Sequence, residues 1–244
     1  MFRAPKPSLV RLEQNYLLAA LPAAARERLR CHLNVTPMAL GEILYQPGAQ
    51  MHDAYFPTTS IVSLLNVMSD GSSTEIAIIG NEGVVGVALF MGSVTSFSYA
   101  VVQGGGYGFS IPANHLIDEF ARGGPVQDLL LHYAQALFTQ IEQTAVCNRH
   151  HSLEQQLCRW LLLSLDRLPS NELVMTQELI ANMLGVRRQG VTEAAHKLQS
   201  LGLIHYSRGH ILVLDRPALE RHACECYAVA TREFDRLLAA QTGR

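Results

Sequence analysis

Residues 174–204 read VMTQELIANMLGVRRQGVTEAAHKLQSLGLI, and this stretch predicts two short helices joined by a tight turn. Thr176 is a favourable N-cap, and Glu178 places a negative charge in the first turn, which suits a helix N-terminus. Helical spacing of Leu179, Ile180, Met183 and Leu184 predicts one apolar face. Gly185 can adopt the positive φ that ends a helix tightly, so the first helix is expected to stop there.

The second helix is expected to run from about Arg187 to Leu201. Its buried face is predicted to consist of Val191, Ala194, Ala195, Leu198 and Leu201, and its opposite face of Arg187, Arg188, Gln189, Thr192 and His196. In a helix-turn-helix, the first residues of the second helix contact base edges in the major groove. Arginine can donate two hydrogen bonds to guanine, and glutamine can pair with adenine. The stretch therefore predicts a double-stranded DNA partner.

The other candidate DNA-contacting residues are Thr176, Glu193, Lys197 and Arg208, together with Thr192, which can reach a base or a phosphate. Lys197 is better placed for a phosphate, whereas Glu193 must either accept from cytosine or pair with an arginine. Residues 203–206 and 211–214 are strand-like, and the turn between them carries Arg208 and His210. This hairpin is expected to form a wing near the DNA backbone, where contacts give affinity and register. Two alternatives stay open: a helical hairpin that only packs, and a sensor or scaffold module whose helix-turn-helix binds protein.

The stretch resembles the DNA-binding domain of the bacterial cyclic-AMP receptor protein and fumarate–nitrate regulator (Crp/Fnr) family. The resemblance rests on TQELIA, LGVRRQGVT and LGLI within residues 176–204, and extends more weakly over the whole chain. It implies a homodimeric transcription regulator with RNA polymerase as a further partner. By the resemblance, Arg188 and Gln189 stand where many members carry a base-reading arginine and glutamate, and Glu193 where many carry another arginine. The two departures imply an operator that differs from the family's usual one.

Composition predicts a globular chain of two small domains, because 244 residues are 48% hydrophobic and 16% charged. The net charge is −2, and residues 171–244 carry nine Lys and Arg against eight Asp and Glu, so any basic patch is local. No apolar run reaches the ~18 residues of a membrane span. Residues 1–8 lack the apolar segment of a signal peptide, so we expect a cytoplasmic protein with reduced thiols.

Residues 35–112 alternate short apolar runs with turn signals and predict a barrel or jelly roll. Residues 61–68 and 74–79 flank a polar turn and predict a hairpin, while residues 14–31 are expected to be helical. The glycine-rich run 104–108 lacks the ending of a phosphate loop, so it is expected to be a hairpin turn or a strand bulge. The resemblance sharpens this region to a β-roll of the cyclic-nucleotide-binding type, which makes the whole chain α+β.

Cyclic AMP is not the expected effector. The family's phosphate cassette pairs a Gly-Glu with a later Arg, whereas the corresponding stretches here are GVAL at residues 86–89 and SFSYA at residues 96–100. No arginine occurs from Cys31 to Ala121, and burying a phosphate without a cation is costly. A different small ligand, or none, is expected.

The five cysteines are Cys31, Cys147, Cys158, Cys224 and Cys226. An iron–sulfur cluster usually needs four thiolates, and only Cys31 lies in the N-terminal third. Cys224 and Cys226 are spaced more tightly than a C-x-x-C motif, and on a helix their sulfurs would point about 200° apart. We therefore expect structural or incidental thiols and no metal site. A haem held by a cysteine or by a histidine such as His52, His115 or His132 stays open. No hydrolase, metalloprotease or Walker motif predicts an enzyme.

A long helix over residues 125–147 is expected to join the two halves. Its apolar residues form a near-heptad seam, which fits a parallel helix pair or packing on the chain's own β-roll. The seam consists of Leu130, Leu137, Ile141 and Thr144, with Tyr133, Ala134, Phe138 and Ala145 beside it. Ser152 and Gln155 predict a capping box after a hinge at residues 148–151, and a last helix is expected from Pro217 to about Ala240. The predicted domains are 1–124, 125–147 and 148–244. A dimer would set two recognition helices about one DNA turn apart to read a palindrome.

Overall fold

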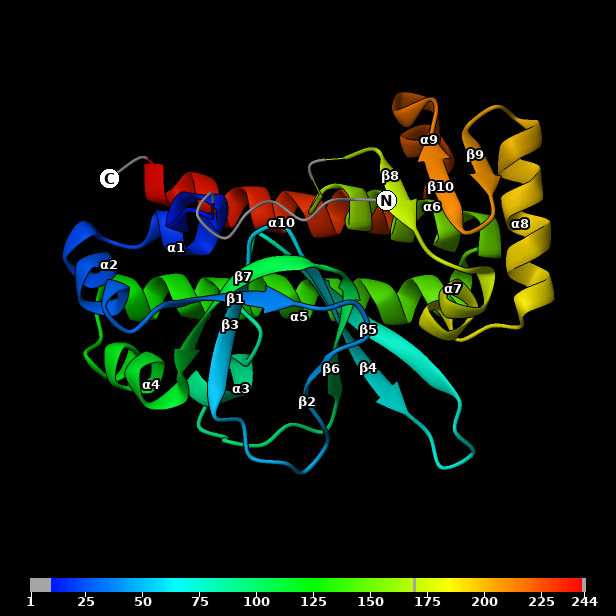
Figure 1. The fold of residues 1–244 in the computed structure, drawn as a ribbon. Coiled ribbons are helices and arrows are strands. Elements are labelled where there is room, and N and C mark those ends of the chain that lie inside the picture. The colour runs from blue at the N-terminus through cyan, green and yellow to red at the C-terminus, as the bar shows by residue number, and fades with distance from the viewer. Residues whose placement is uncertain (1–9, 169, 243–244) are drawn as a thin grey trace.

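The computed structural model describes residues 10–168 and 170–242. The prediction about residues 1–8 lies outside these residues. Within them, the chain has the predicted α+β fold, with an N-terminal β-roll, a long helix and a smaller C-terminal domain (Figure 1). Among the described residues, no helix is long and apolar enough to cross a membrane.

The β-roll consists of two antiparallel sheets. One sheet has the order β1-β7-β3, formed by β1 (Asn34–Met38), β7 (Gly106–Pro112) and β3 (Asp53–Pro57). The other has the order β2-β6-β4-β5, formed by β2 (Ile43–Tyr45), β6 (Tyr99–Gly104), β4 (Ile61–Val67) and β5 (Ser73–Ile79). The predicted hairpin is confirmed as β4–β5, in which Val67 pairs with Ser73. Apolar side chains of both sheets share one core.

The glycine-rich run opens no helix, but the expected hairpin turn is wrong, because the strands it joins, β6 and β7, belong to different sheets. The alternative expectation, a bulge, fits the register shift between β4 and β6 beside Gly104. A Cβ at Gly106 would lie 2.5 Å from the carbonyl oxygen of Thr59, and one at Gly108 would lie 2.7 Å from that of Phe56. Glycine is needed here because the backbone of β7 passes close to neighbouring backbone.

Short helices surround the roll: a 3-10 turn η2 (Leu12–Gln14), α1 (Tyr16–Ala20), α2 (Ala23–Arg30), α3 (Val87–Phe90) and α4 (Ala113–Ala121). The long helix α5 runs from Pro125 to His150, and α10 (Glu225–Thr242) packs beside it (Figure 1). Residues 148–150, expected to be part of a hinge, are therefore helical. The break falls at His151, and Ser152 forms the predicted capping box with Gln155.

The predicted seam of α5 is buried mainly against the chain's own β-roll. Tyr133, Ala134, Leu130 and Leu137 are at most 4% exposed and belong to the β-roll core, which agrees with the second of the two interpretations. Another apolar stripe faces solvent instead: Leu131, Phe138 and Val146 are 48%, 46% and 45% exposed, and Ala145 is exposed beside them.

The C-terminal domain packs α6 (Leu153–Leu165), α7 (Gln177–Leu184), α8 (Arg188–Ser200) and α9 (Arg216–His222) around a second apolar core. A three-stranded sheet of order β8-β10-β9 covers one edge, formed by β8 (Glu172–Val174), β10 (His210–Val213) and β9 (Ile204–Ser207). The single last helix predicted from Pro217 is wrong, because residues 223 and 224 interrupt it between α9 and α10. Phe234 and Leu237 of α10 join the core of the β-roll.

Candidate DNA interface and a cysteine cluster

Local signals place the helix-turn-helix as predicted. The Thr176 hydroxyl accepts a hydrogen bond from the Leu179 amide at 3.3 Å and caps α7, and Gly185 ends α7 with φ 65°. Helix α8 begins at Arg188, with Arg187 as its N-cap, and ends at Ser200. Two details were wrong: Leu179 and Leu201 are 41% and 52% exposed and do not belong to the buried faces. Leu201 is the C-cap of α8, where the helix no longer turns it toward the core.

The candidate DNA-contacting residues of α8 face solvent. Val191, Ala194, Ala195 and Leu198 fill the domain core, which turns Arg187, Arg188, Gln189, Thr192, Glu193 and Lys197 outward. Gln189 donates to Glu193 at 3.0 Å, so Glu193 is paired with a neighbour on its own helix rather than with an arginine. Lys197 is held 2.7 Å from Glu154 of α6. In this conformation its ammonium group is directed to a carboxylate.

The wing is a tight β-hairpin. Residues Arg208 and Gly209 form its two-residue turn with φ 50° and 83°, the geometry of a type I′ turn. Arg208 is exposed at the tip, whereas His210 is 2.7 Å from Glu172 of β8. The Arg208 side chain is therefore the more available of the two predicted basic contacts.

Three hydrogen bonds bring the wing, the start of α7 and the first turns of α8 onto one surface. The Met175 amide donates to the Gly209 carbonyl at 2.6 Å, and the Tyr206 hydroxyl donates to the Met175 carbonyl at 2.9 Å. Thr192 donates to Gln177 at 2.7 Å. Arg188 lies close enough to Tyr206 to oppose the rise in the pKa of that phenol, which burial causes. Thr176, Arg188, Thr192 and the wing therefore border a common surface.

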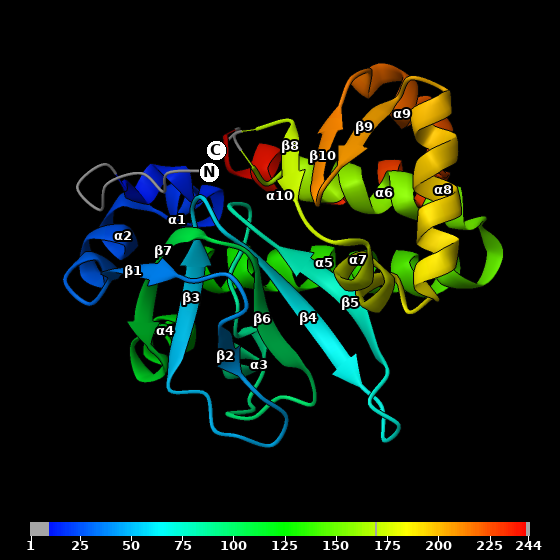
Figure 2. The same ribbon diagram turned by 45° about the vertical axis from the view of Figure 1, so that its right-hand side comes forward.

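The helix-turn-helix is docked on the β-roll. Ser73 of β5 donates to the carbonyl of Asn182 at 3.5 Å, and a Cβ at Gly185 would lie 2.4 Å from the Thr74 hydroxyl. Farther along the contact, Trp160 of α6 donates to Glu75 at 3.1 Å. These contacts join the β-roll to the C-terminal domain within one chain (Figure 2).

The β-roll interior is apolar where the family's phosphate cassette is expected. Leu89 and Phe90 of α3 are 2% and 4% exposed and belong to the β-roll core. The chain from Cys31 to Ala121 contains neither arginine nor lysine. No cation of this segment can therefore neutralise a bound phosphate.

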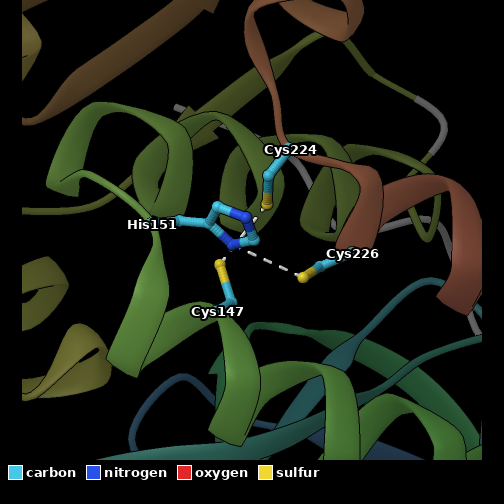
Figure 3. A group of neighbouring side chains, drawn as sticks. All are labelled: Cys147, His151, Cys224 and Cys226. Carbon is cyan, nitrogen blue, oxygen red and sulfur yellow. Dashed lines mark hydrogen bonds between the residues drawn. The ribbon is translucent and has the colours of Figure 1, made fainter.

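Four residues that the sequence did not connect come together beside the hinge (Figure 3). One ligand atom each of Cys147, His151, Cys224 and Cys226 lies within 4.8 Å of all the others. Cys147 Sγ is 3.5 Å from Cys224 Sγ, and Cys226 Sγ is 3.6 Å from His151 Nδ1. We call this group the Cys3His cluster. The hydrogen bond between Cys147 and Cys224 lowers the pKa of Cys224 to about 5 and raises the pKa of Cys147.

The expectation that Cys224 and Cys226 point apart was wrong, because only Cys226 lies inside a helix. Helix α10 begins at Glu225, and Cys224 precedes it in the linker. The sequence signal for the cluster was a C-x-x-x-H spacing at Cys147 and His151, which puts both side chains on one face at the end of α5. The partner pair lies more than seventy residues away, so spacing alone could not join the two halves.

Comparison with known proteins agrees with this geometry. Residues 155–222 match the family model described as the Crp-like helix-turn-helix domain. No curated protein sequence matches the chain. Among solved structures, FixK2 from Bradyrhizobium japonicum has a TM-score of 0.66 at 16% identity, covering 79% of this chain and 98% of its own.

Two further structures have the same fold. A protein described as a transcriptional regulator of the Crp/Fnr family from Eubacterium rectale has a TM-score of 0.66 at 21% identity, covering 85% of this chain and 98% of its own. TTHB099, a CRP-family transcriptional regulator from Thermus thermophilus, has a TM-score of 0.64 at 18% identity, covering 77% of this chain and 96% of its own. Residues 155–222 are therefore a Crp-like helix-turn-helix domain, and the chain as a whole has the fold of these regulators.

Proposed function

We propose that the protein is a homodimeric regulator that reads a palindromic DNA site with α8 and responds to a signal other than cyclic AMP. The observation that carries the proposal is the common exposed surface of α8, the start of α7 and the wing. On it, Arg187, Arg188 and Arg208 present guanidinium groups that base edges and phosphates can accept from. Contact with RNA polymerase and a cytoplasmic location complete the proposal, since a regulator acts where transcription takes place.

The homodimer is supported by the solvent-facing stripe of α5. Leu131, Phe138 and Ala145 are spaced by seven residues and are exposed, with Val146 beside them. Such a repeat fits a parallel pair of helices, and pairing would bury the apolar side chains that water now contacts. Two α8 helices from a symmetric dimer match the symmetry of a palindrome.

The choice of signal follows from charge. A phosphate diester buried in the β-roll would meet no arginine or lysine from the segment 31–121, and an unpaired buried charge is strongly unfavourable. We infer an uncharged effector in the roll, or control from elsewhere in the molecule.

A selection experiment tests the DNA-binding proposal. Random duplexes bound by the full chain should enrich a palindrome with half-sites about 10 base pairs apart. On the selected site, Arg188→Ala should weaken binding by about 1–3 kcal/mol and relax the preference at one base pair. Arg122→Ala is the matched control, because Arg122 pairs with Glu119 on the sensor domain.

Two results would count against this proposal. If Arg188→Ala lost the same binding free energy on selected and on scrambled duplexes, Arg188 would contact only phosphates. Binding that is independent of salt and of duplex sequence would favour the alternative, a helix-turn-helix that binds protein.

A further inference from the structure

The two connections of the DNA-binding domain pass through the Cys3His cluster. Cys147 and His151 lie on the segment that leads from α5 into α6, and Cys224 and Cys226 lie on the segment that leads from α9 into α10. The body between them, residues 152–222, contains the helix-turn-helix and the wing. A bond across the cluster would therefore fasten both ends of the domain to each other.

The side chains are arranged like the ligands of one small metal ion. With zinc–sulfur bonds of about 2.3 Å, tetrahedral geometry places neighbouring ligand atoms about 3.8 Å apart. The separations of 3.5 Å between Cys147 and Cys224 and of 3.6 Å between Cys226 and His151 are close to that value. Multi-iron clusters need thiolates that reach different irons, whereas these four ligand atoms all lie within 4.8 Å of one another.

The histidine is oriented as a metal ligand. Its Nδ1 faces the cysteine sulfurs, and its Nε2 lies 3.3 Å from a carboxylate oxygen of Glu225. A carboxylate on the far ring nitrogen fixes the tautomer that leaves Nδ1 free to bind a metal. Gln156 donates to the carbonyls of Cys147 and His151, at 3.4 and 2.9 Å, and holds the backbone of both.

The surroundings supply a charge that such a site needs. Three thiolates and a neutral histidine around a divalent ion carry one net negative charge. Arg159 is 4% exposed and follows by three residues Gln156, which holds the backbone of Cys147 and His151. Its guanidinium donates to Thr144 at 3.2 Å, while its Nε has no hydrogen-bond partner in the described part of the chain. In the described part of the chain Arg159 forms no ion pair, although its charge acts on Glu75, and an anionic metal centre would further balance this buried cation.

We propose that Cys147, His151, Cys224 and Cys226 bind a single Zn²⁺ ion, which fastens the hinge between α5 and the DNA-binding domain. Three sulfurs and one nitrogen in a closed tetrahedral arrangement select zinc among the common divalent ions and leave no position for substrate. The cysteines are 0%, 5% and 1% exposed, which protects their thiolates from exchange. The metal site stands independently of the proposed function, whereas its effect on DNA affinity rests on that function.

Metal content is the first test. The full chain, purified without chelator under a phosphine reductant, should contain one zinc per chain by mass spectrometry of the elements. Cys224→Ser and Cys147→Ser should lose it. Cys31→Ser, at an exposed thiol, and Cys158→Ala, at a buried thiol in the domain core, are matched controls that should keep it. Substoichiometric zinc in the folded unaltered chain, or full zinc in Cys224→Ser, would overturn the site.

Two measurements guard against variants that fail to fold. In the unaltered chain, replacing zinc with Co²⁺ should give the strong visible absorption of a tetrahedral thiolate complex. Adding zinc to the metal-free chain should raise Tm by about 5–10 °C at a free concentration of about one hundred times Kd. Glu225→Gln should retain zinc but bind it about 10–100-fold more weakly in competition with a chelator. A Cys147–Cys224 disulfide in the anaerobically purified chain, with no metal uptake, would refute the proposal.

The coupling to DNA is tested on the same samples. Zinc removal should change the Kd for the selected duplex by about 5- to 150-fold, the usual range for coupled sites. An unchanged Kd overturns the coupling but not the site, which the zinc stoichiometry decides. If the zinc-bound protein binds no DNA duplex, the proposed function and the coupling are both overturned. The zinc stoichiometry, and therefore the metal site, is unaffected by that result.

Discussion

Glu75 should make the protein less stable as the pH rises toward neutrality. This β5 carboxyl is 7% exposed, and burial raises its pKa from 4.5 to about 7, against the opposing effects of the Ser63 hydroxyl, Arg159, Trp160 and Arg167. Below pH 4.5 the group is protonated in both the folded and the unfolded chain. Between 4.5 and about 7 the folded chain keeps a proton that the unfolded chain releases, so this stabilisation is lost as the pH rises through the folded pKa.

The size of the effect follows from the shift. Each pKa unit corresponds to about 1.4 kcal/mol, so the full change is about 3.5 kcal/mol, of which about 2.5 kcal/mol falls between about pH 5 and pH 8. Glu75→Gln removes the titration and keeps an oxygen that accepts from the Trp160 indole, while its amide nitrogen can donate to the Ser63 hydroxyl. The variant should therefore gain about 2.5 kcal/mol relative to the unaltered chain over this pH interval, whatever constant offset the substitution adds.

Urea unfolding of both proteins at closely spaced pH values measures this difference, because all other titrating groups act equally on the two curves. A difference between the two proteins that stays constant from pH 5 to pH 8 would refute the reasoning, and would mean that Glu75 titrates alike in the folded and unfolded chains.

Three further changes test other parts of the structure. Phe138→Glu should convert a dimer into monomers in analytical ultracentrifugation, whereas Phe97→Glu, at a residue 97% exposed, should not; unaltered assembly of Phe138→Glu would exclude the α5 stripe as the interface. Gly185→Ala should lower the free energy of unfolding in urea by more than Gly202→Ala, because both glycines have a positive φ but only Gly185 faces a neighbouring side chain. Equal losses of unfolding free energy would show that docking of Gly185 on β5 adds nothing to stability. Arg167→Ala should lower stability by about 3–5 kcal/mol, since Glu82, 2.8 Å away, would remain buried and unpaired; a loss below about 1 kcal/mol would mean that water reaches the carboxylate.

The parts of the fold that short-range signals determine could be predicted from the sequence. Thr176 caps α7, Gly185 ends it, and Ser152 caps α6, because each interaction involves residues at most a few positions apart. The two-residue turn at Arg208 set the wing in the same way. The exposed face of α8 followed from helical periodicity, since every third or fourth residue is apolar.

Predictions that depended on a tertiary partner were incomplete. Periodicity showed that α5 is apolar around much of its circumference, but it could not show that Leu137 faces the β-roll and Phe138 faces solvent. The Cys3His cluster was missed for a related reason. The angular argument assumed that Cys224 and Cys226 share a helix, and the linker at Cys224 becomes visible only when α9 and α10 are packed on different bodies.

Helix α6 contacts both α8 and the parts of the chain on its opposite side, namely β5 and the end of α5. Toward α8, Glu154 holds Lys197, and a Cβ on Gly190 would lie 2.8 Å from Leu153, so the two helices are in close contact. Toward the rest of the chain, Trp160 binds Glu75, and Gln156 and Arg159 bind the end of α5. Packed interiors resist continuous deformation, so a change at the β-roll or the cluster that rotates α6 must move α8 with it. The proposed signal therefore does not need to approach the proposed DNA-contacting residues, because a change in the contacts of α6 on its opposite side is enough to move α8.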